Sequence, residues 1–247
     1  MYFRFGGPFL PEIVRLDVPA PEALRGLSAL FVADLHFGCT RSPIPHTLPI
    51  VDMIRDLAPS LILWGGDYAE PGCHRALFPL LAALQPPLGA FGVIGNNDRG
   101  ENFSAFPALQ LLVNRSVRVG NLPLRIIGLD DARTGSPDLS LIDPPSEAVF
   151  QLLLSHSPLA LRRMPSSLWP NLTLCGHTHG GQIALCGLSP YSFGYEHFAA
   201  RRDNFFLTGS HAPAPSARVV VSNGIGTSLF PVRIGAPPQL HLITFAE

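Results

Sequence analysis

The sequence predicts an α/β protein in which a sheet is covered by helices. Five short apolar runs have the length and the branched or aromatic content of buried strands, and each ends at polar residues: 27–36, 61–67, 91–98, 150–158 and 172–180. Stretches with helical character lie around 46–57, 73–85, 101–110 and 145–150. Alternation of this kind is typical of a sheet flanked by helices. We therefore expect the functional site at the carboxyl ends of the strands.

The last third of the chain has a different pattern. After residue 183 a glycine- and aromatic-containing stretch precedes two more strand-like runs, 218–224 and 239–247. The sequence shows neither an internal repeat nor a linker, so we expect a single domain over residues 1–247. A long loop or lid is expected at about 186–216, close to the site, because long loops in compact domains are often functional.

Composition and charge argue against several classes of protein. The 247 residues carry a net charge of -1 without a basic cluster, which disfavours nucleic-acid binding. The four cysteines form no CxxC pair, which indicates a reducing cytoplasm. No apolar run approaches the roughly 18–20 residues of a membrane-spanning helix, so we expect no inserted segment.

Side chains that commonly bind metals follow the five central runs. They are Asp34, His36, Asp67, Asn96, His156, His177 and His179. A single DxH or HxH indicates little, because a histidine at a strand end is more often an ordinary polar residue. Five such endings together favour a metal site, and imidazole and carboxylate donors without a thiolate suit Mn, Fe or Zn. Seven donors are too many for one tetrahedral ion but suit two divalent ions that share a bridging carboxylate.

The motifs occur in an order that resembles the calcineurin-like metallophosphoesterase superfamily: Asp34-Leu35-His36, Gly66-Asp67, Gly95-Asn96, His156 and Gly176-His177-Thr178-His179. The resemblance implies a four-layer α-β-β-α sandwich, with two packed mixed β-sheets flanked by helices. It implies one metal site at Asp34, His36 and His179, with Asp67 as the bridge. It implies a second at Asn96, His156 and His177. A hydroxide between the ions would attack a phosphoester or a pyrophosphate.

The stretch 176–183, together with 222–245, further resembles a bacterial branch of membrane-associated phosphoesterases. Some members of that branch hydrolyse UDP-2,3-diacylglucosamine. The resemblance therefore points to a lipid-linked or sugar-nucleotide substrate. The aromatic and arginine residues of the proposed lid suit such a substrate or a peripheral contact with the inner membrane. An ordinary lid that packs on its own core would contain the same residues.

One position departs from the family pattern. The family usually has a histidine after Gly95-Asn96, which helps to protonate the leaving group, but this chain has Asn97. Losing a general acid typically removes about 10²–10⁴ in rate, and phosphate or nucleotide leaving groups need that help least. Asn97 therefore favours a pyrophosphate bond or an activated ester, unless His46 or another nearby residue supplies the proton. Catalytic roles are expected for Asp67, Asn96, Asn97 and His156.

Other residues are assigned with their alternatives open. Arg99 and Arg41 follow ligand motifs and, with Asn97, are expected to bind substrate, although a solvated surface arginine is the competing interpretation. Asp130 and Asp131 are expected in a turn. His74 is expected at the surface or in a loop, and His241 is expected to be structural.

These observations predict a cytoplasmic, two-metal phosphoric ester hydrolase. Its substrate is expected to be a small or lipid-linked phosphoester, and no nucleic-acid partner is expected. A nucleotide or cyclic-nucleotide phosphodiesterase would use the same metals. A non-catalytic scaffold with this fold is a third interpretation: the missing histidine supports it, and the complete set of ligands opposes it.

Overall fold

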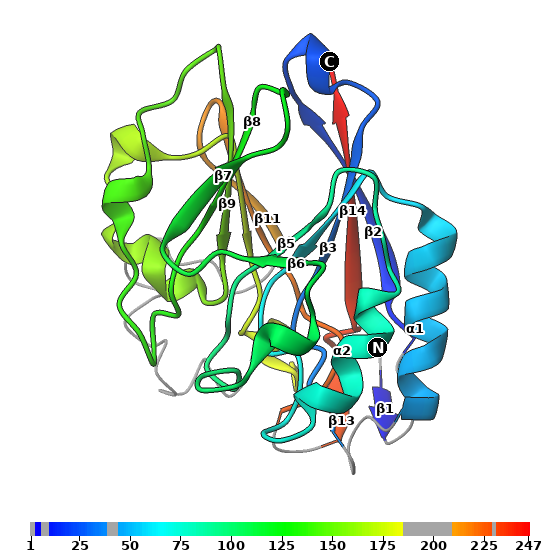
Figure 1. The fold of residues 1–247 in the computed structure, drawn as a ribbon. Helices are drawn as coiled ribbons and strands as arrows, with labels where there is room; N and C mark the ends of the chain where they lie inside the picture. The colour runs from blue at the N-terminus through cyan, green and yellow to red at the C-terminus, as the bar shows by residue number, and fades with distance from the viewer. Residues whose placement is uncertain (1–2, 6–9, 39–43, 185–208, 229–230) are drawn as a thin grey trace.

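Two six-stranded sheets pack face to face in the computed structural model, which describes residues 3–5, 10–38, 44–184, 209–228 and 231–247 (Figure 1). The first sheet contains, in spatial order, β2 (Glu12–Pro19), β14 (Gln239–Ala246), β3 (Ser28–Val32), β4 (Leu61–Trp64), β5 (Ala90–Gly92) and β6 (Leu109–Leu111). The second contains β11 (Gly209–Ala214), β12 (Ala217–Val221), β10 (Leu172–Cys175), β9 (Phe150–Ser155), β8 (Leu124–Gly128) and β7 (Arg115–Arg118). A separate antiparallel pair joins β1 (Phe3–Phe5) to β13 (Val232–Ile234).

Both sheets are mixed, as predicted. In the first sheet β3, β4, β5 and β6 run parallel, and β14 is antiparallel to β3. In the second sheet β8, β9, β10 and β12 run parallel, and the edge strands β7 and β11 are antiparallel to their neighbours. The carboxyl ends of the parallel strands in each sheet therefore lie along one edge, where their following loops can meet.

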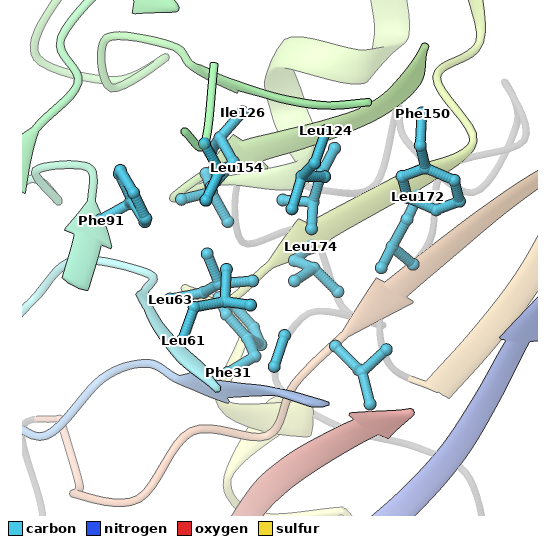
Figure 2. Packing of buried hydrophobic residues seen from close by; sticks show 14 of the residues in the cluster. Phe31, Leu61, Leu63, Phe91, Leu124, Ile126, Phe150, Leu154, Leu172 and Leu174 are labelled. Atoms are coloured by element: carbon cyan, nitrogen blue, oxygen red, sulfur yellow. The ribbon is translucent and has the colours of Figure 1, made fainter. Parts of the chain in front are cut away.

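The main core fills the space between the two sheets. Figure 2 shows Phe31, Leu61 and Leu63 of the first sheet facing Leu154 and Leu174 of the second. All five side chains are buried. Each of these strands is covered on both faces, which is why it reads as a continuous apolar run in the sequence.

Two helices cover the outer face of the first sheet (Figure 1). In α1 (Ile44–Leu57) the buried positions are Thr47, Ile50, Val51 and Ile54. In α2 (His74–Ala82) they are His74, Leu77, Phe78 and Leu81. Both sets follow the i, i+3, i+4, i+7 spacing of a helix with one buried face. Within the described ranges, no helix is both long and apolar enough to cross a membrane.

The prediction of helices at 101–110 and 145–150 is wrong. In the first segment the Asn102 side chain accepts a hydrogen bond from the Ser104 amide at 2.9 Å and caps a single 3-10 turn, after which β6 begins. Pro107 cannot donate the backbone hydrogen bond that a helix would need there. The second segment forms a bridge between Ser146 and Val149 that leads directly into β9.

Short 3-10 segments cover the outer face of the second sheet. They are η3 (Leu139–Leu141), η4 (Pro158–Arg163) and η5 (Ser166–Leu168). Side chains from these segments pack on Leu153 and Val219. The sandwich architecture is confirmed, with this layer built from turns rather than α-helices. In the segment proposed as a loop, residues 209–214 form β11, and 185–208 lie outside the described residues.

Candidate metal centre

The predicted ligands stand on the loops that leave β3, β4, β5, β9 and β10 at their carboxyl ends. Five of them have backbone φ angles in the left-handed region, which residues other than glycine rarely adopt. They are Asp34 (52°), His36 (43°), Asp67 (52°), His177 (70°) and His179 (52°). A left-handed residue directly after a strand turns the chain sharply and redirects its side chain. Such strain costs of the order of 1–3 kcal/mol per residue and is concentrated at functional sites.

The first cluster consists of Asp34, His36 and His179, all buried. The Nε2 atoms of His36 and His179 lie 3.1 Å apart, and His179 Nε2 lies 3.8 Å from Asp34 Oδ1. On its other side, His36 Nδ1 lies 3.7 Å from Glu70 Oε1. A carboxylate behind a histidine is a common arrangement that orients a metal-binding imidazole.

The second cluster consists of Asp67, His156 and His177, which are also buried. His156 Nε2 lies 3.2 Å from His177 Nδ1. The other ring nitrogen of His156, Nδ1, lies 2.8 Å from the Gly65 carbonyl. Because a carbonyl only accepts, Nδ1 donates this hydrogen bond and Nε2 faces the cluster.

Asp67 lies between the two clusters. Its Oδ2 atom is 3.4 Å from His36 Nε2 and 3.5 Å from His156 Nε2. One carboxylate oxygen thus lies near an imidazole of each cluster. A carboxylate that bridges two ions would need such a position between the two clusters.

Each cluster draws side chains from both sheets. Asp34 and His36 follow β3 of the first sheet, whereas their partner His179 follows β10 of the second. Asp67 follows β4 of the first sheet, whereas His156 follows β9 of the second. The site therefore forms only when the two sheets are packed against each other in this relative position.

Glycines allow the loops to approach one another. A Cβ added to Gly176 would lie 2.5 Å from Asp34 Oδ2, and one added to Gly95 would overlap Asp67. No larger residue fits at either position without moving a carboxylate of the site.

The charges of the two clusters act on one another. Burial raises the pKa of Asp34 to about 6. Burial disfavours the charged form of Asp67, but the charge and hydrogen bond of His156 hold its pKa well below the ordinary value. Burial likewise disfavours charged His156, yet Asp67 and Asp34 raise its pKa to about 10. Burial, together with the positive charges of His36 and Arg233, lowers the pKa of His179 well below its usual range. Carboxylates and imidazoles in such proximity form an environment suited to a cation.

The donor set fits two divalent ions. Each cluster supplies two imidazoles and a carboxylate, the mixture that Mn, Fe and Zn accept. The buried Asn96 Oδ1 atom accepts no hydrogen bond from any residue that the structure describes. A buried acceptor without a donor is costly, and a metal ion would satisfy it. The role of Asn96 in the second site stays a prediction.

A buried aspartate and a buried histidine in contact with it support the site from beneath. Asp98 Oδ2 accepts hydrogen bonds from the backbone amides of Asp67 and Gly95, at 2.6 and 2.7 Å. Its Oδ1 accepts from the Tyr68 amide at 3.0 Å and lies 2.8 Å from His74 Nε2. The expected surface or loop position of His74 is wrong: it is buried at the start of α2, because its imidazole pairs with Asp98.

The predicted substrate residues have different outcomes. Asn97 reaches the centre, where its amide Nδ2 donates to Asp67 Oδ2 at 2.7 Å. Arg99 instead donates to Asp130 Oδ1 at 2.5 Å and to Thr134 Oγ1 at 3.2 Å, so its guanidinium is held by the 130–134 turn. Arg41 lies outside the described residues. Asp131, as expected, accepts hydrogen bonds within that turn.

Sequence reasoning gave no role to Glu70, Asp98 or Arg233. Asp98 follows Asn97 directly but carries no signal of burial. Arg233 is an isolated charge in an apolar strand, which is the signal that could have identified it, because buried charges are rare unless they are paired.

Comparisons with known proteins agree with this geometry. The sequence model of the calcineurin-like phosphoesterases matches residues 27–181, more than half of the chain. The metallophosphoesterase YkuE of Bacillus subtilis (strain 168) is 30% identical over 262 residues, which cover 98% of this chain and 88% of that protein. The phosphodiesterase YaeI of Escherichia coli (strain K12) is 27% identical over 230 residues, which cover 87% of this chain and 80% of that protein.

A mammalian relative is also similar. A transmembrane protein with a metallophosphoesterase domain from Bos taurus is 27% identical over 259 residues, which cover 93% of this chain and 56% of that protein. The family match spans β3 to the GHTHGG loop and includes every predicted metal ligand. The chain therefore belongs to the calcineurin-like phosphoesterase family and is a metal-dependent phosphoesterase.

Proposed function

We propose that this chain hydrolyses a phosphodiester or a pyrophosphate at a centre of two divalent metal ions. The observation that carries the proposal is the position of Asp67 Oδ2 between His36 and His156, one imidazole from each cluster. Asp34, His36 and His179 would hold one ion. Asn96, His156 and His177 would hold the other, with Asp67 shared by both. When bound, such ions lower the pKa of water and neutralise charge on the phosphoryl oxygens.

The chain's own residues would orient this chemistry. Glu70 and the Gly65 carbonyl hold the rings of His36 and His156 so that their Nε2 atoms face Asp67. Asn97 would position Asp67, because it donates to both carboxylate oxygens through its backbone amide and its side chain. Rings and carboxylates held in this way need little rearrangement during the reaction.

The chemical nature of the leaving group is proposed from the presence of Asn97 in place of a histidine. The side chain that stands at the family's acid position is an amide, which cannot protonate an alkoxide. A leaving group that departs as a phosphate or as an activated oxyanion needs no such proton. The name of YaeI, a phosphodiesterase, supports the choice of a diester over a simple monoester.

The finer identity of the substrate is also part of the proposal. A lipid-linked or sugar-nucleotide substrate would suit the aromatic residues of 186–208, which lie outside the described residues. We place the protein in the cytoplasm, with a peripheral contact at the inner membrane where the substrate is lipid-linked. Mn, Fe and Zn all suit the donors, and Mn is the ion for the first assay.

The test is hydrolysis, with added Mn, of a nitrophenyl monoester, a nitrophenyl diester, a cyclic nucleotide and a UDP-linked acylated sugar. We expect the diester or the sugar nucleotide to be cleaved in preference to the monoester. Asp67→Asn should lower kcat/KM by more than the 10–100-fold loss typical of residues that only support a ligand. Asp138→Asn makes the same chemical change at an exposed carboxylate and should leave the rate unchanged. Full activity in Asp67→Asn would refute the two-metal centre.

A further inference from the structure

Arg233 is fully buried on β13, directly behind the first cluster. Its NH2 atom lies 3.3 Å from His179 Nδ1, the ring nitrogen that faces away from the cluster. Its NH1 atom donates to the His179 backbone carbonyl at 3.3 Å. One guanidinium therefore contacts both the ring and the main chain of a predicted metal ligand.

The same guanidinium also holds a second segment next to the cluster. It donates to the Asn223 carbonyl at 2.8 Å, and its Nε donates to the Gly226 carbonyl at 3.0 Å. The segment between them contacts Asp34, because the Gly226 amide donates to the Asp34 carbonyl at 2.7 Å. Arg233 thus connects the loop after β10 to the loop after β12, and both loops surround the first cluster.

We propose that Arg233 is a positioning residue for the first metal site, acting on His179 through its backbone carbonyl. The inference rests on the proposed two-metal function. A planar guanidinium has five N–H donors in fixed directions, more than lysine or glutamine has, and can therefore satisfy carbonyls on two loops at once. Arg233 lies outside residues 27–181, the segment that the family model matches.

The second cluster provides an internal comparison. His156 is oriented by the Gly65 carbonyl, and His177 donates from its backbone to Asp34 at 2.9 Å. The Arg233 guanidinium, by contrast, donates to the carbonyl of His179, a residue of the first cluster. Its removal should therefore weaken one of the two sites selectively.

The experiment is a Mn²⁺ binding isotherm of the full chain, by calorimetry and by electron paramagnetic resonance. Wild type should bind two ions. In Arg233→Gln one site should weaken about 10–100-fold, the usual loss for a residue that supports a ligand, while the other changes less than threefold. The weakened site should be the one lost in His36→Ala and retained in His156→Ala.

A matched control is Arg125→Gln. Arg125 also donates to a backbone carbonyl, that of Leu141 at 3.0 Å, but it lies on β8 away from both clusters. This variant should keep both sites. Should Arg233→Gln not fold, Arg233→Lys keeps the charge and enters the same comparison, with weakening of the same site expected.

The possible failures are distinguishable. A wild type that does not bind two ions would overturn the proposed metal centre itself. A wild type with two sites, together with a folded Arg233 variant that keeps both affinities or loses both equally, would overturn only the role of Arg233. A purely structural arginine would shift the unfolding midpoint of the chelated protein without this selective loss.

Discussion

A buried histidine that is not among the predicted metal ligands should make the fold sensitive to acid. His241 alternates with Ile243 and Phe245 along β14, so it points with them into the core between the sheets. Its ring lies 6.3 Å from that of Phe31, and its Nε2 atom has no hydrogen-bond partner among the described residues. Burial lowers the pKa of His241 from 6.5 to about 4.

The direction in which stability changes with pH follows from proton binding. Above pH 6.5 His241 is neutral in the folded and in the unfolded chain, so its contribution to stability is complete. Between pH 6.5 and 4 the unfolded chain binds a proton that the folded chain does not, so stability falls as the pH falls. With pKa values of 6.5 and about 4, the loss between pH 7.5 and 5.0 is about 2 kcal/mol. In a chain of this length that loss corresponds to a fall in Tm of about 4–8 °C.

The perturbation is His241→Leu, measured by urea unfolding in the presence of a chelator between pH 5.0 and 7.5. The chelator keeps the titration of the metal ligands common to both proteins. Stability of wild type relative to the variant should fall by about 2 kcal/mol across this range. A difference that stays constant within about 0.5 kcal/mol would refute the argument that His241 is buried as the neutral form.

Three further predictions concern the site. Gly176→Ala places a Cβ 2.5 Å from Asp34 Oδ2, so one Mn²⁺ site should be lost in a binding isotherm; an unchanged isotherm would contradict the crowding. Because metal ligands bind deprotonated and the pKa of His156 is about 10, Mn²⁺ binding at pH 7 should release a proton, seen as a heat that depends on the buffer. Buffer-independent heat would contradict this. Asp98→Ala removes the acceptor of three backbone amides and of the His74 ring, and should cost about 3–5 kcal/mol of unfolding free energy in urea; a loss below 1 kcal/mol would show that these bonds contribute little.

The parts of the fold that the sequence predicted are those with local signals. β3, β4 and β10 are buried on both faces, so each is an apolar run that ends at a ligand motif. The edge strands β2 and β7 carry exposed polar residues and give no such signal. Their pairing depends on neighbours that lie far away in the chain.

The candidate site also contains residues with a local sequence signal and residues without one. All seven predicted ligand positions stand in short motifs, and the structure brings six of them, all but Asn96, together as two clusters that meet at Asp67. The residues that orient them arrive through tertiary contacts: Arg233 meets His179 across 54 positions, and Asp98 meets Asp67 across 31. The contact between Arg99 and Asp130, which are 31 positions apart, likewise has no local signal, and the substrate role of Arg99 stays a prediction.

The division of each cluster between the two sheets also has a mechanical consequence. An ion held by His36 and His179, or by Asp67 and His156, would cross-link the two sheets, whose shared core consists mainly of apolar side chains. Such an ion would resist sliding of one sheet over the other and would slow the separation of the two sheets. Amide protons of β9 and β10 should then exchange more slowly in the metal-loaded protein, and the lifetime of the folded chain would follow the metal supply of the cell.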